Sequence, residues 1–419
     1  SYTIHLAPIP GKSSTDDALT IKALLHDGTV RYWQALPPTP KNSHFLPASS
    51  PMPAPLAACR SIICMCLSGI GDALTFTPFL AALKRARPDI AIDMLVMFRS
   101  AESLFQAHQA VRHTFFVNFL GQSSLRSLRD VLRIRARGYD ASVVALPANR
   151  WEYNLVQTLL CSRTVGHRYH HLDIPNLNFI KRHWVWEDES RHVVEQNLDL
   201  LQFFGVPRPA DPGPLVMHLT SSDHHEADHW LRSHVSTSGP LIAFHPGSAL
   251  FKNHIMKRWP ATSFAALAQR LADQHNASIL VFGTPDEHEL KHFICSQSHR
   301  PHHVLSVDGT SLRVSAALIK RCALMISNDS ALMHVAAAMQ TPVVAIFAYT
   351  NHRSLYPWHV PHRIVRRNLP CSPCFYYSPR PAFCHARLNY TCIKDIPVDD
   401  VHRAANDLLS SSPPSSGAI

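Results

Sequence analysis

The sequence predicts an α/β protein built from two domains, each with an open and mostly parallel sheet. The chain has 419 residues, which is long for a single domain. Buried-strand patterns alternate with helical patterns, as in sheets whose strands are joined by helical crossovers. This alternation occurs in two separate runs, and a proline-rich stretch, VPRPADPGP (206–214), lies between them.

The first run begins with an apolar stretch, CRSIICMCL (59–67), which is typical of a buried parallel strand. Residues 73–86 have helical periodicity, and we expect Pro78 near the first turn of that helix, where proline is tolerated. The other elements expected in this run are strands at 89–97 and 139–147 and a helix at 191–205. Together they predict a first domain over residues 59–215.

The second run predicts a domain over residues 216–405. Its strands are expected in PLIAFHPGS, ASILVFGTPDEHE, LMISNDS and TPVVAIFAYT. Its helices are expected in SFAALAQRLADQH, SLRVSAALIKRCA and ALMHVAAAMQ. Two Rossmann-like domains joined by a linker place a cleft between the carboxyl ends of two parallel sheets.

Two flanking segments stand apart from these domains. Residues 1–58 contain a candidate strand pair around Asp27 and then a linker rich in proline and serine. We expect residues 406–419, which end in SSSPPSSGAI, to form a disordered tail.

Composition limits the classes of partner. The formal net charge is +10, but the basic residues are dispersed, which argues against a nucleic-acid arm. A dispersed basic surface suits anionic substrates or peripheral contact with a membrane, and an ordinary solvated surface fits equally well. We see no signal peptide and no run of about 18 apolar residues. We therefore expect a cytoplasmic protein, with contact at the inner face of the inner membrane left open.

The stretch SGIGDALTFTP (68–78) holds two glycines and an aspartate between a strand and a helix. A dinucleotide-binding fingerprint requires a third glycine, but position 74 is leucine. The acidic residue that binds the ribose should end the second strand, whereas Asp93 falls inside it. Both departures argue against a nicotinamide site, although a nicotinamide-dependent oxidoreductase remains one alternative.

Five motifs in order resemble glycosyltransferase family 9, the bacterial heptosyltransferases. They are SGIGDALTFTPFLAALKRARP (68–88), FHPGS (244–248), KRWP (257–260), FGTPDEHE (282–289) and SNDSALMHVAAAMQTPVVAIFAYT (327–350). The resemblance covers roughly residues 60–405. It implies the GT-B fold, with two Rossmann-like domains facing a central cleft, and an inverting transfer of a heptose or similar sugar.

The resemblance also implies which residues bind the nucleotide-sugar donor. They are Gly247, Ser248, Lys257, Glu287, Asp329, Ser330, Ala331 and His334. Lys257 would neutralise the phosphates, together with the amides that begin the helix after Ser330. Glu287 would bind the ribose, with Glu289 as the competing candidate. Ala331 stands where the family usually has glycine, so the backbone approaches the phosphate less closely.

Each of these assignments has a plainer alternative. Asp329 could be an ordinary helix cap, and Lys257 a surface lysine beside a core tryptophan. The loop before Lys257, SALFKNHIM, is longer than the usual family loop, which leaves the register there open.

The resemblance gives Asp72 a catalytic role. With the donor on the second domain, the first domain faces the acceptor, and a carboxylate at a helix start can take the proton of an acceptor hydroxyl. We expect the helix end and nearby lysines to keep Asp72 ionised at neutral pH. A capping aspartate without a catalytic role is the alternative. No catalytic metal is expected, because Lys257 and the helix amides would carry the charge of the leaving group.

Four cysteines near the C-terminus form a candidate metal site within CSPCFYYSPRPAFCHARLNYTC (371–392): Cys371, Cys374, Cys384 and Cys392. A C-x2-C pair lets two thiolates reach one ion, and the later pair can complete a tetrahedron. Structural iron or zinc is favoured, and free thiols or disulfides remain open. His385 could replace one ligand. Autotransporter heptosyltransferases carry a comparable iron-binding loop with wider spacing, so the chain is similar to that branch too.

The implied partners are a nucleotide-diphosphate sugar, ADP-heptose first, and an acceptor that is either the lipopolysaccharide core or an autotransporter protein. A homo-oligomer is compatible with the resemblance, and nucleic acid is not expected. A second alternative is a non-catalytic binding protein that uses its cysteine loop as a metal module.

Overall fold

The computed structural model describes residues 4–5, 20–24, 30–34, 55–148, 150–376 and 381–411. The chain divides into two units, Ser1–Met52 and Pro53–Ile419. In the first unit, strands β1 (Ile4–His5), β2 (Thr20–Leu24) and β3 (Val30–Gln34) pair antiparallel. The strand pair expected around Asp27 is therefore present. The proline-rich linker lies almost wholly outside the described residues.

The second unit contains two parallel sheets, as predicted. The first has six strands in the order β6-β5-β4-β7-β8-β9. Their bounds are β4 Ser61–Cys66, β5 Ala91–Val96, β6 His113–Phe116, β7 Ala141–Val144, β8 Thr164–Arg168 and β9 His183–Trp186. The central strand β4 is buried along nearly its whole length, which explains its continuous apolar sequence.

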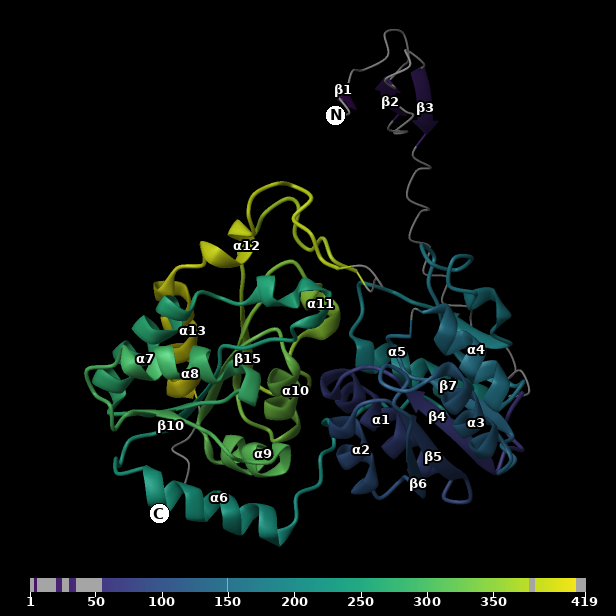
Figure 1. Cartoon of the computed structure of the whole chain (residues 1–419), viewed down its shortest axis with the longest axis horizontal. Helices are drawn as coiled ribbons and strands as arrows, with labels where there is room; N and C mark the ends of the chain where they lie inside the picture. The colour runs from purple at the N-terminus through teal and green to yellow at the C-terminus, as the bar shows by residue number, and fades with distance from the viewer. Residues whose placement is uncertain are drawn as a thin grey trace. The chain divides into compact units, whose positions relative to one another are not determined.

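Helices join these strands and cover the sheet (Figure 1). Their bounds are α1 Ile70–Ala86, α2 Arg99–Gln106, α3 Ser124–Arg135, α4 Trp151–Leu160, α5 Val193–Asp199, η1 Asn178–Ile180 and η2 Leu200–Phe204. The helix that we expected over 191–205 is thus an α-helix followed directly by a 3-10 turn.

Helix α1 begins earlier than expected, so Pro78 lies in its interior and not near its first turn. Proline has no N–H and leaves the carbonyl of Leu74, four residues back, without its helical partner. The hydroxyl of Thr77 donates to that carbonyl at 2.7 Å. The same hydroxyl accepts from Val216 N at 2.8 Å, which ties the helix to the interdomain linker. The Thr77 hydroxyl therefore provides the hydrogen bond that the Leu74 carbonyl loses because of Pro78.

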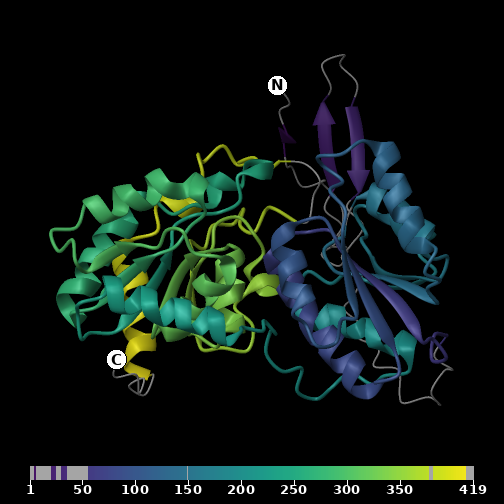
Figure 2. The same ribbon diagram turned by 60° about the horizontal axis from the view of Figure 1, so that its bottom comes forward.

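The second sheet has the order β12-β11-β10-β13-β14-β15 and is also parallel. Its strands are β10 Leu241–His245, β11 Ser278–Val281, β12 Val304–Ser306, β13 Leu324–Asn328, β14 Val343–Ile346 and β15 His362–Val365. Its helices are α6 Ser221–His234, η3 Phe251–Lys257, α7 Ala261–His275, η4 Pro285–Glu287, α8 His288–Ser296, α9 Leu312–Arg321, α10 Ala331–Ala338, α11 His352–Leu355, α12 Thr391–Lys394 and α13 Val398–Ser411. Figure 2 shows these helices around the sheet from a second direction.

The last helix corrects the expected tail. Helix α13 continues to Ser411, and Leu408 within it is buried in the core of the second sheet. Burial of that leucine explains why the helix continues past residue 405. Only residues 412–419 of the expected disordered tail lie outside the described residues.

The two sheets share an apolar core and several polar contacts. One continuous apolar cluster contains Ile62 of the first sheet and Leu280 of the second. Asn351 donates to the carbonyl of Glu189 at 2.6 Å, and Trp358 Nε1 donates to the carbonyl of Gly213 at 2.9 Å. Helix α1 also packs against α10. Among the described residues, no helix has the length and apolarity that crossing a membrane requires.

Candidate functional site

Asp72 is the site residue predicted in the first sheet domain. It lies in the first turn of α1, which follows strand β4. It is partly buried, and burial raises the pKa of its carboxyl to about 6. A hydrogen bond with Ser68 and the charges of Lys257 and Lys252 act in the opposite direction, whereas Asp329 raises the pKa further. The lysines therefore act as we expected, but burial outweighs them. Asp72 is still mostly ionised at pH 7, with a pKa suited to a general base.

The turn that holds Asp72 contacts the second sheet domain at Gly71. A Cβ atom at Gly71 would lie 3.0 Å from His334 Cδ2 and 3.5 Å from the Cα of Ala331, both on α10. An added Cβ would therefore require the His334 ring to shift by a few tenths of an ångström. The second glycine of the opening motif thus serves close helix packing. Because of this contact, Asp72 lies beside the start of α10, where the donor residues were predicted.

At the start of α10, Asp329 is not a helix cap. Its Oδ2 atom accepts a hydrogen bond from Lys257 Nζ at 2.8 Å and another from the hydroxyl of Thr350 at 2.7 Å. Burial acts to raise the pKa of Asp329, but Lys257 and Thr350 outweigh it and lower the pKa. The side chains of Lys257 and Asp329 are 11% and 6% exposed, so Lys257 is no ordinary surface lysine. Thr350 was missed by the sequence reasoning, although it ends a motif already singled out.

A chain of polar contacts connects Ser330 to Glu287. A hydrogen bond of 2.7 Å joins Ser330 Oγ to His245 Nδ1, and His245 Nε2 lies 3.5 Å from Glu287 Oε2. Arg258 donates to Glu287 at 2.7 Å, and the backbone N–H groups of Ser248 and Thr284 each donate at 3.0 Å. Protein groups thus surround the carboxylate predicted to bind ribose.

The pKa of Glu287 is about 2. Burial acts to raise it, but the hydrogen bond and charge of His245, the Thr284 N–H and Arg258 outweigh burial. A Cβ at Gly247 would lie 2.0 Å from Glu287 Oε1, so only glycine lets the loop after β10 approach this carboxylate. Glu289 is exposed on α8, which leaves Glu287 as the acid at the site.

Arg258 holds the loop after β10 in place. Its guanidinium donates to the carbonyl of Ser248 at 2.6 Å and to the Ser248 hydroxyl at 3.1 Å. The Ser248 hydroxyl in turn donates to the carbonyl of His254 at 2.9 Å. Sequence reasoning did not place Arg258 or His245 in the site. Both residues could have been found from the sequence, since Arg258 lies within KRWP (257–260) and His245 within FHPGS (244–248).

His334 is buried on the side of α10 that faces Gly71. Burial lowers the pKa of its imidazole to about 4, so the ring is neutral at pH 7. Its Nδ1 atom has no hydrogen-bond partner among the described residues. Ser330, at the N-cap of the helix, makes no side-chain capping bond. Met333 N donates to the carbonyl of Ser330 at 3.2 Å, so the amides of Ala331 and Leu332 are the ones available to an anion.

The four C-terminal cysteines line one small cavity of about 50 Å³, together with Tyr349 and Tyr390. All ten cysteines of the chain are free thiols, so no disulfide is present. Burial and then the neighbouring thiols raise the pKa of Cys392 to about 11. In the described part of the chain, however, no three His, Cys, Asp or Glu side chains are grouped closely enough to hold a metal ion. The donor types suit iron or zinc, but their arrangement is not a formed tetrahedral site.

The long loop before Lys257 packs against this cysteine segment. Lys252 and Asn253 have φ angles of 55° and 59°, which turn the chain within η3. The carbonyl of Lys252 accepts from Ala382 N at 3.0 Å, and the Asn253 amide donates to the carbonyl of Ala382 at 2.9 Å. The extra length of the loop therefore serves a contact with residues next to Cys384.

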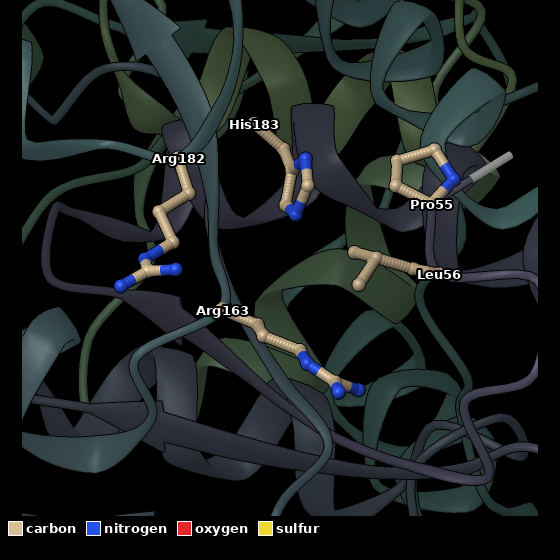
Figure 3. A pocket seen from close by; sticks show the side chains of 5 residues that line it. All are labelled: Pro55, Leu56, Arg163, Arg182 and His183. Atoms are coloured by element: carbon tan, nitrogen blue, oxygen red, sulfur yellow. The ribbon is translucent and has the colours of Figure 1, made fainter.

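A larger cavity of about 520 Å³ lies elsewhere on the first sheet domain. Figure 3 shows its lining, with Pro55 and Leu56 across the space from Arg182, and Arg163 and His183 between them. Arg163 and Arg182 directly precede strands β8 and β9, so the cavity lies at the amino edge of the sheet. Asp72 follows the carboxyl end of β4, and this cavity is therefore separate from the predicted site.

Two parallel sheets, a partly buried carboxylate after strand β4 of one and a helix start with a buried lysine on the other are the features expected of a GT-B glycosyltransferase. A profile of glycosyltransferase family 9 (heptosyltransferase) matches residues 132–381, which is more than half of the chain. The chain belongs to this family, and the prediction of a glycosyltransferase is confirmed.

Individual relatives agree with this assignment. Lipopolysaccharide heptosyltransferase 3 of Escherichia coli K12 is 24% identical over 366 residues, which cover 82% of this chain and 97% of the relative. A family 9 glycosyltransferase structure from Veillonella parvula has a TM-score of 0.69 at 24% identity, covering 84% of this chain and 98% of that one. E. coli heptosyltransferase WaaC with ADP-2-deoxy-2-fluoro heptose has a TM-score of 0.57 at 19% identity, covering 83% and 99%.

The fold is also similar to that of TibC, a dodecameric iron-containing heptosyltransferase that was solved with ADP-D-beta-D-heptose. The TM-score is 0.50 at 12% identity, and the match covers 85% of this chain and 77% of TibC. The GT-B fold that the resemblance implied is therefore confirmed, and the nicotinamide-dependent oxidoreductase is not favoured.

The raised pKa of Asp72 predicts a stability effect that needs no substrate. Below pH 4 the carboxyl is protonated in the folded and unfolded chains alike. Between about pH 4 and 6 only the unfolded chain ionises, so the folded state loses stability as pH rises. Asp72→Asn removes this cost and should raise the free energy of unfolding by about 1–3 kcal/mol at pH 7. Denaturant titrations should show the gain disappearing below about pH 4.

Asp93→Asn is the matched control, and its expected effect on the free energy of unfolding at pH 7 is opposite in sign. The Asp93 carboxylate accepts two hydrogen bonds from Arg112, at 2.9 and 3.0 Å, and one from Tyr139 at 2.8 Å. These contacts outweigh burial and lower its pKa, so the variant should lose stability at pH 7. If Asp72→Asn is also destabilising at pH 7, its carboxylate is held by favourable contacts and the raised pKa is wrong.

Proposed function

We propose that the protein transfers a heptose from ADP-heptose to a hydroxyl group of an acceptor, with inversion at the anomeric carbon. The observation that carries the proposal is the contact of the Asp72 turn with the start of α10, which supports a carboxylate acting beside the first amides of that helix. The relatives and solved structures named for heptosyltransferases, two of them with ADP-heptose or its fluoro analogue, support the donor.

Asp72 is the proposed general base. Its carboxylate takes the proton of the acceptor hydroxyl while that oxygen forms a bond to the anomeric carbon. The bond from the anomeric carbon to the diphosphate oxygen breaks on the opposite face, and the electron pair leaves with ADP. A base with a pKa of about 6 is ionised at pH 7, yet it remains basic enough to accept a proton in the transition state.

The leaving diphosphate is proposed to bind Lys257 and the free amides of α10, with further hydrogen bonds from Ser330 and the unpaired Nδ1 of His334. Lys257 already has a carboxylate partner in Asp329, which fixes the ammonium group near the helix start. Ala331 contributes backbone only. We propose that these groups supply the positive charge that transfer requires, so that no catalytic metal takes part.

Three further donor residues are proposed to act as a group. Gly247 and Ser248 form the loop after β10, and Glu287 holds that loop through its hydrogen bond from Ser248 N. A ribose hydroxyl would reach Glu287 only by joining or replacing one of its four protein contacts. Glu287 thus keeps its proposed contact with the nucleoside, but its observed partners support a role in shaping the pocket as well.

We also propose a structural metal on the cysteine loop and a glycan as the acceptor. Cys371, Cys374, Cys384 and Cys392 would hold structural iron or zinc if the loop closes around the ion, and no step of transfer passes through it. TibC is iron-containing and dodecameric, which supports both a metal and a homo-oligomer here. A lipopolysaccharide-core glycan is the favoured acceptor because of the relatives' names, and an autotransporter protein stays an alternative.

Asp72→Asn should abolish transfer and leave donor affinity nearly unchanged. General base catalysis contributes roughly 10²–10⁴-fold, and the proposed donor contacts lie on the other sheet domain. Transfer from ADP-heptose can be followed by ADP release, and binding of ADP by calorimetry. Should the variant keep transfer within about tenfold of wild type, Asp72 is not the base. Should it lose ADP affinity, the turn belongs to the donor site.

Lys257→Ala should weaken ADP binding by about 1.5–3 kcal/mol, the usual scale for a hydrogen bond to a charged group. Binding of adenosine should barely change, since the lysine is assigned to the phosphates. Lys320→Ala, which removes an exposed lysine on α9, is the matched control and should alter neither. Equal loss for adenosine and ADP would show that Lys257 does not act on phosphate and that the register before it is wrong, with Arg258 or Lys252 the next residue to test.

A further inference from the structure

Helix α3 presents an exposed apolar stripe that nothing in the transfer reaction uses. Leu125, Leu128 and Leu132 are 81%, 42% and 45% exposed. Their spacing of three and four residues puts them on one face of the helix. The opposite face, with Val131 and Ile134, is buried in the core beneath α4. Figure 1 shows α3 on the outer side of the first sheet, beside α4.

Basic side chains flank this stripe. Residues 123–138 contain five arginines and a single acidic residue, Asp130. The side chains of Arg126 and Arg129 make no hydrogen bond or ion pair with any described residue. Arg133 is 69% exposed and lies 3.9 Å from Asp130. Leucines along the centre of an exposed face with arginines beside them match helices that lie in the headgroup region of a bilayer.

We propose that α3 is a docking surface for a membrane that contains anionic lipids. The arginines would meet the lipid headgroups, while the leucines would enter the boundary with the acyl chains. A second copy of the chain fits the surface poorly, because a symmetric interface would bring the same arginines together with one aspartate each. Nucleic acid fits poorly as well, since phosphates would leave the central leucines exposed.

The neighbouring helix connects this surface to the base. On α4, Trp151 and Leu155 are 47% and 40% exposed and lie one turn apart. Tyr153, on the same helix, donates to the carbonyl of Leu67 at 3.1 Å, just before the turn that holds Asp72. A docked protein would therefore hold its base at a fixed position relative to the lipid surface. This last step rests on the proposed function, whereas docking itself does not.

The test is cosedimentation of the full chain with lipid vesicles. Wild-type protein should bind vesicles that contain phosphatidylglycerol more tightly than vesicles of phosphatidylcholine, and added salt should weaken the binding. The variant L125S/L128S/L132S should bind phosphatidylglycerol vesicles at least about tenfold more weakly. The variant R126E/R129E/R133E should lose the preference for anionic lipid. The control F293S removes an exposed apolar side chain on α8 of the second sheet domain and should bind as wild type does.

Thermal melting and ADP binding of each variant show whether it is folded, and neither depends on the acceptor. Wild-type protein that does not sediment with anionic vesicles would overturn the proposal. So would a leucine variant that binds vesicles as tightly as wild type. If wild type is an oligomer that the leucine changes dissociate, without any vesicle binding, the surface is an interface between copies. If wild type and the leucine variant bind DNA equally tightly, the arginines bind nucleic acid, and the membrane proposal is wrong.

Discussion

The close approach of α1 to α10 at Gly71 is the constraint on which the site depends. A single Cβ at this position would lie 3.0 Å from the ring of His334. Without that atom, the first turns of two helices from different sheets meet, and the residues at both starts share one partly desolvated space. Of the glycine pair that suggests a dinucleotide cradle in the sequence, the second glycine, Gly71, is thus explained by packing between domains, whereas a Cβ at Gly69 would meet no atom within 4 Å.

This contact places two carboxylates, Asp72 and Asp329, in one electrostatic environment and gives them different properties. Burial raises the pKa of Asp72, and the negative charge of Asp329 adds to the effect. Asp329 is more deeply buried but has Lys257 and Thr350 as partners, and these lower its pKa. Two titratable groups pushed apart in this way divide the roles between them. In the proposed reaction Asp72 takes the proton, while Asp329 remains an anion that holds Lys257 through a 2.8 Å hydrogen bond.

Much of the fold could be predicted from the sequence because each buried strand is a continuous apolar run. Strands β4, β10, β13 and β14 fall within the stretches that we expected. Strands β6, β8, β9, β12 and β15 were missed, since they are short and all but β12 contain histidine, threonine or arginine. The position of Pro78 was also misjudged, because the hydroxyl that compensates for it belongs to Thr77 and has no signature in the hydrophobic pattern.

Some residues of the candidate site could be predicted from the sequence, and others could not. Asp72, Lys257 and Ser330 carry motif signals, and the structure brings them to one region. Arg258, His245 and Thr350 have roles that depend on contacts between loops distant in sequence, such as the 2.7 Å bond from Arg258 to Glu287. The exposed stripe of α3 has the leucine spacing of an ordinary core face, and only the observed burial of its opposite side reveals that the leucines face outward.

The pH dependence of transfer tests the central claim most directly, since it reports the ionisation of the base. Values of kcat/KM for transfer, which report the ionisation of the free enzyme, should be constant above about pH 7. They should fall about tenfold per pH unit below the Asp72 pKa of about 6. The sign follows from the chemistry, because only the ionised carboxylate can accept the proton. Values that stay constant down to pH 5, or that fall only near pH 4, would contradict the account, since Asp72 would then have the pKa of a solvated carboxyl.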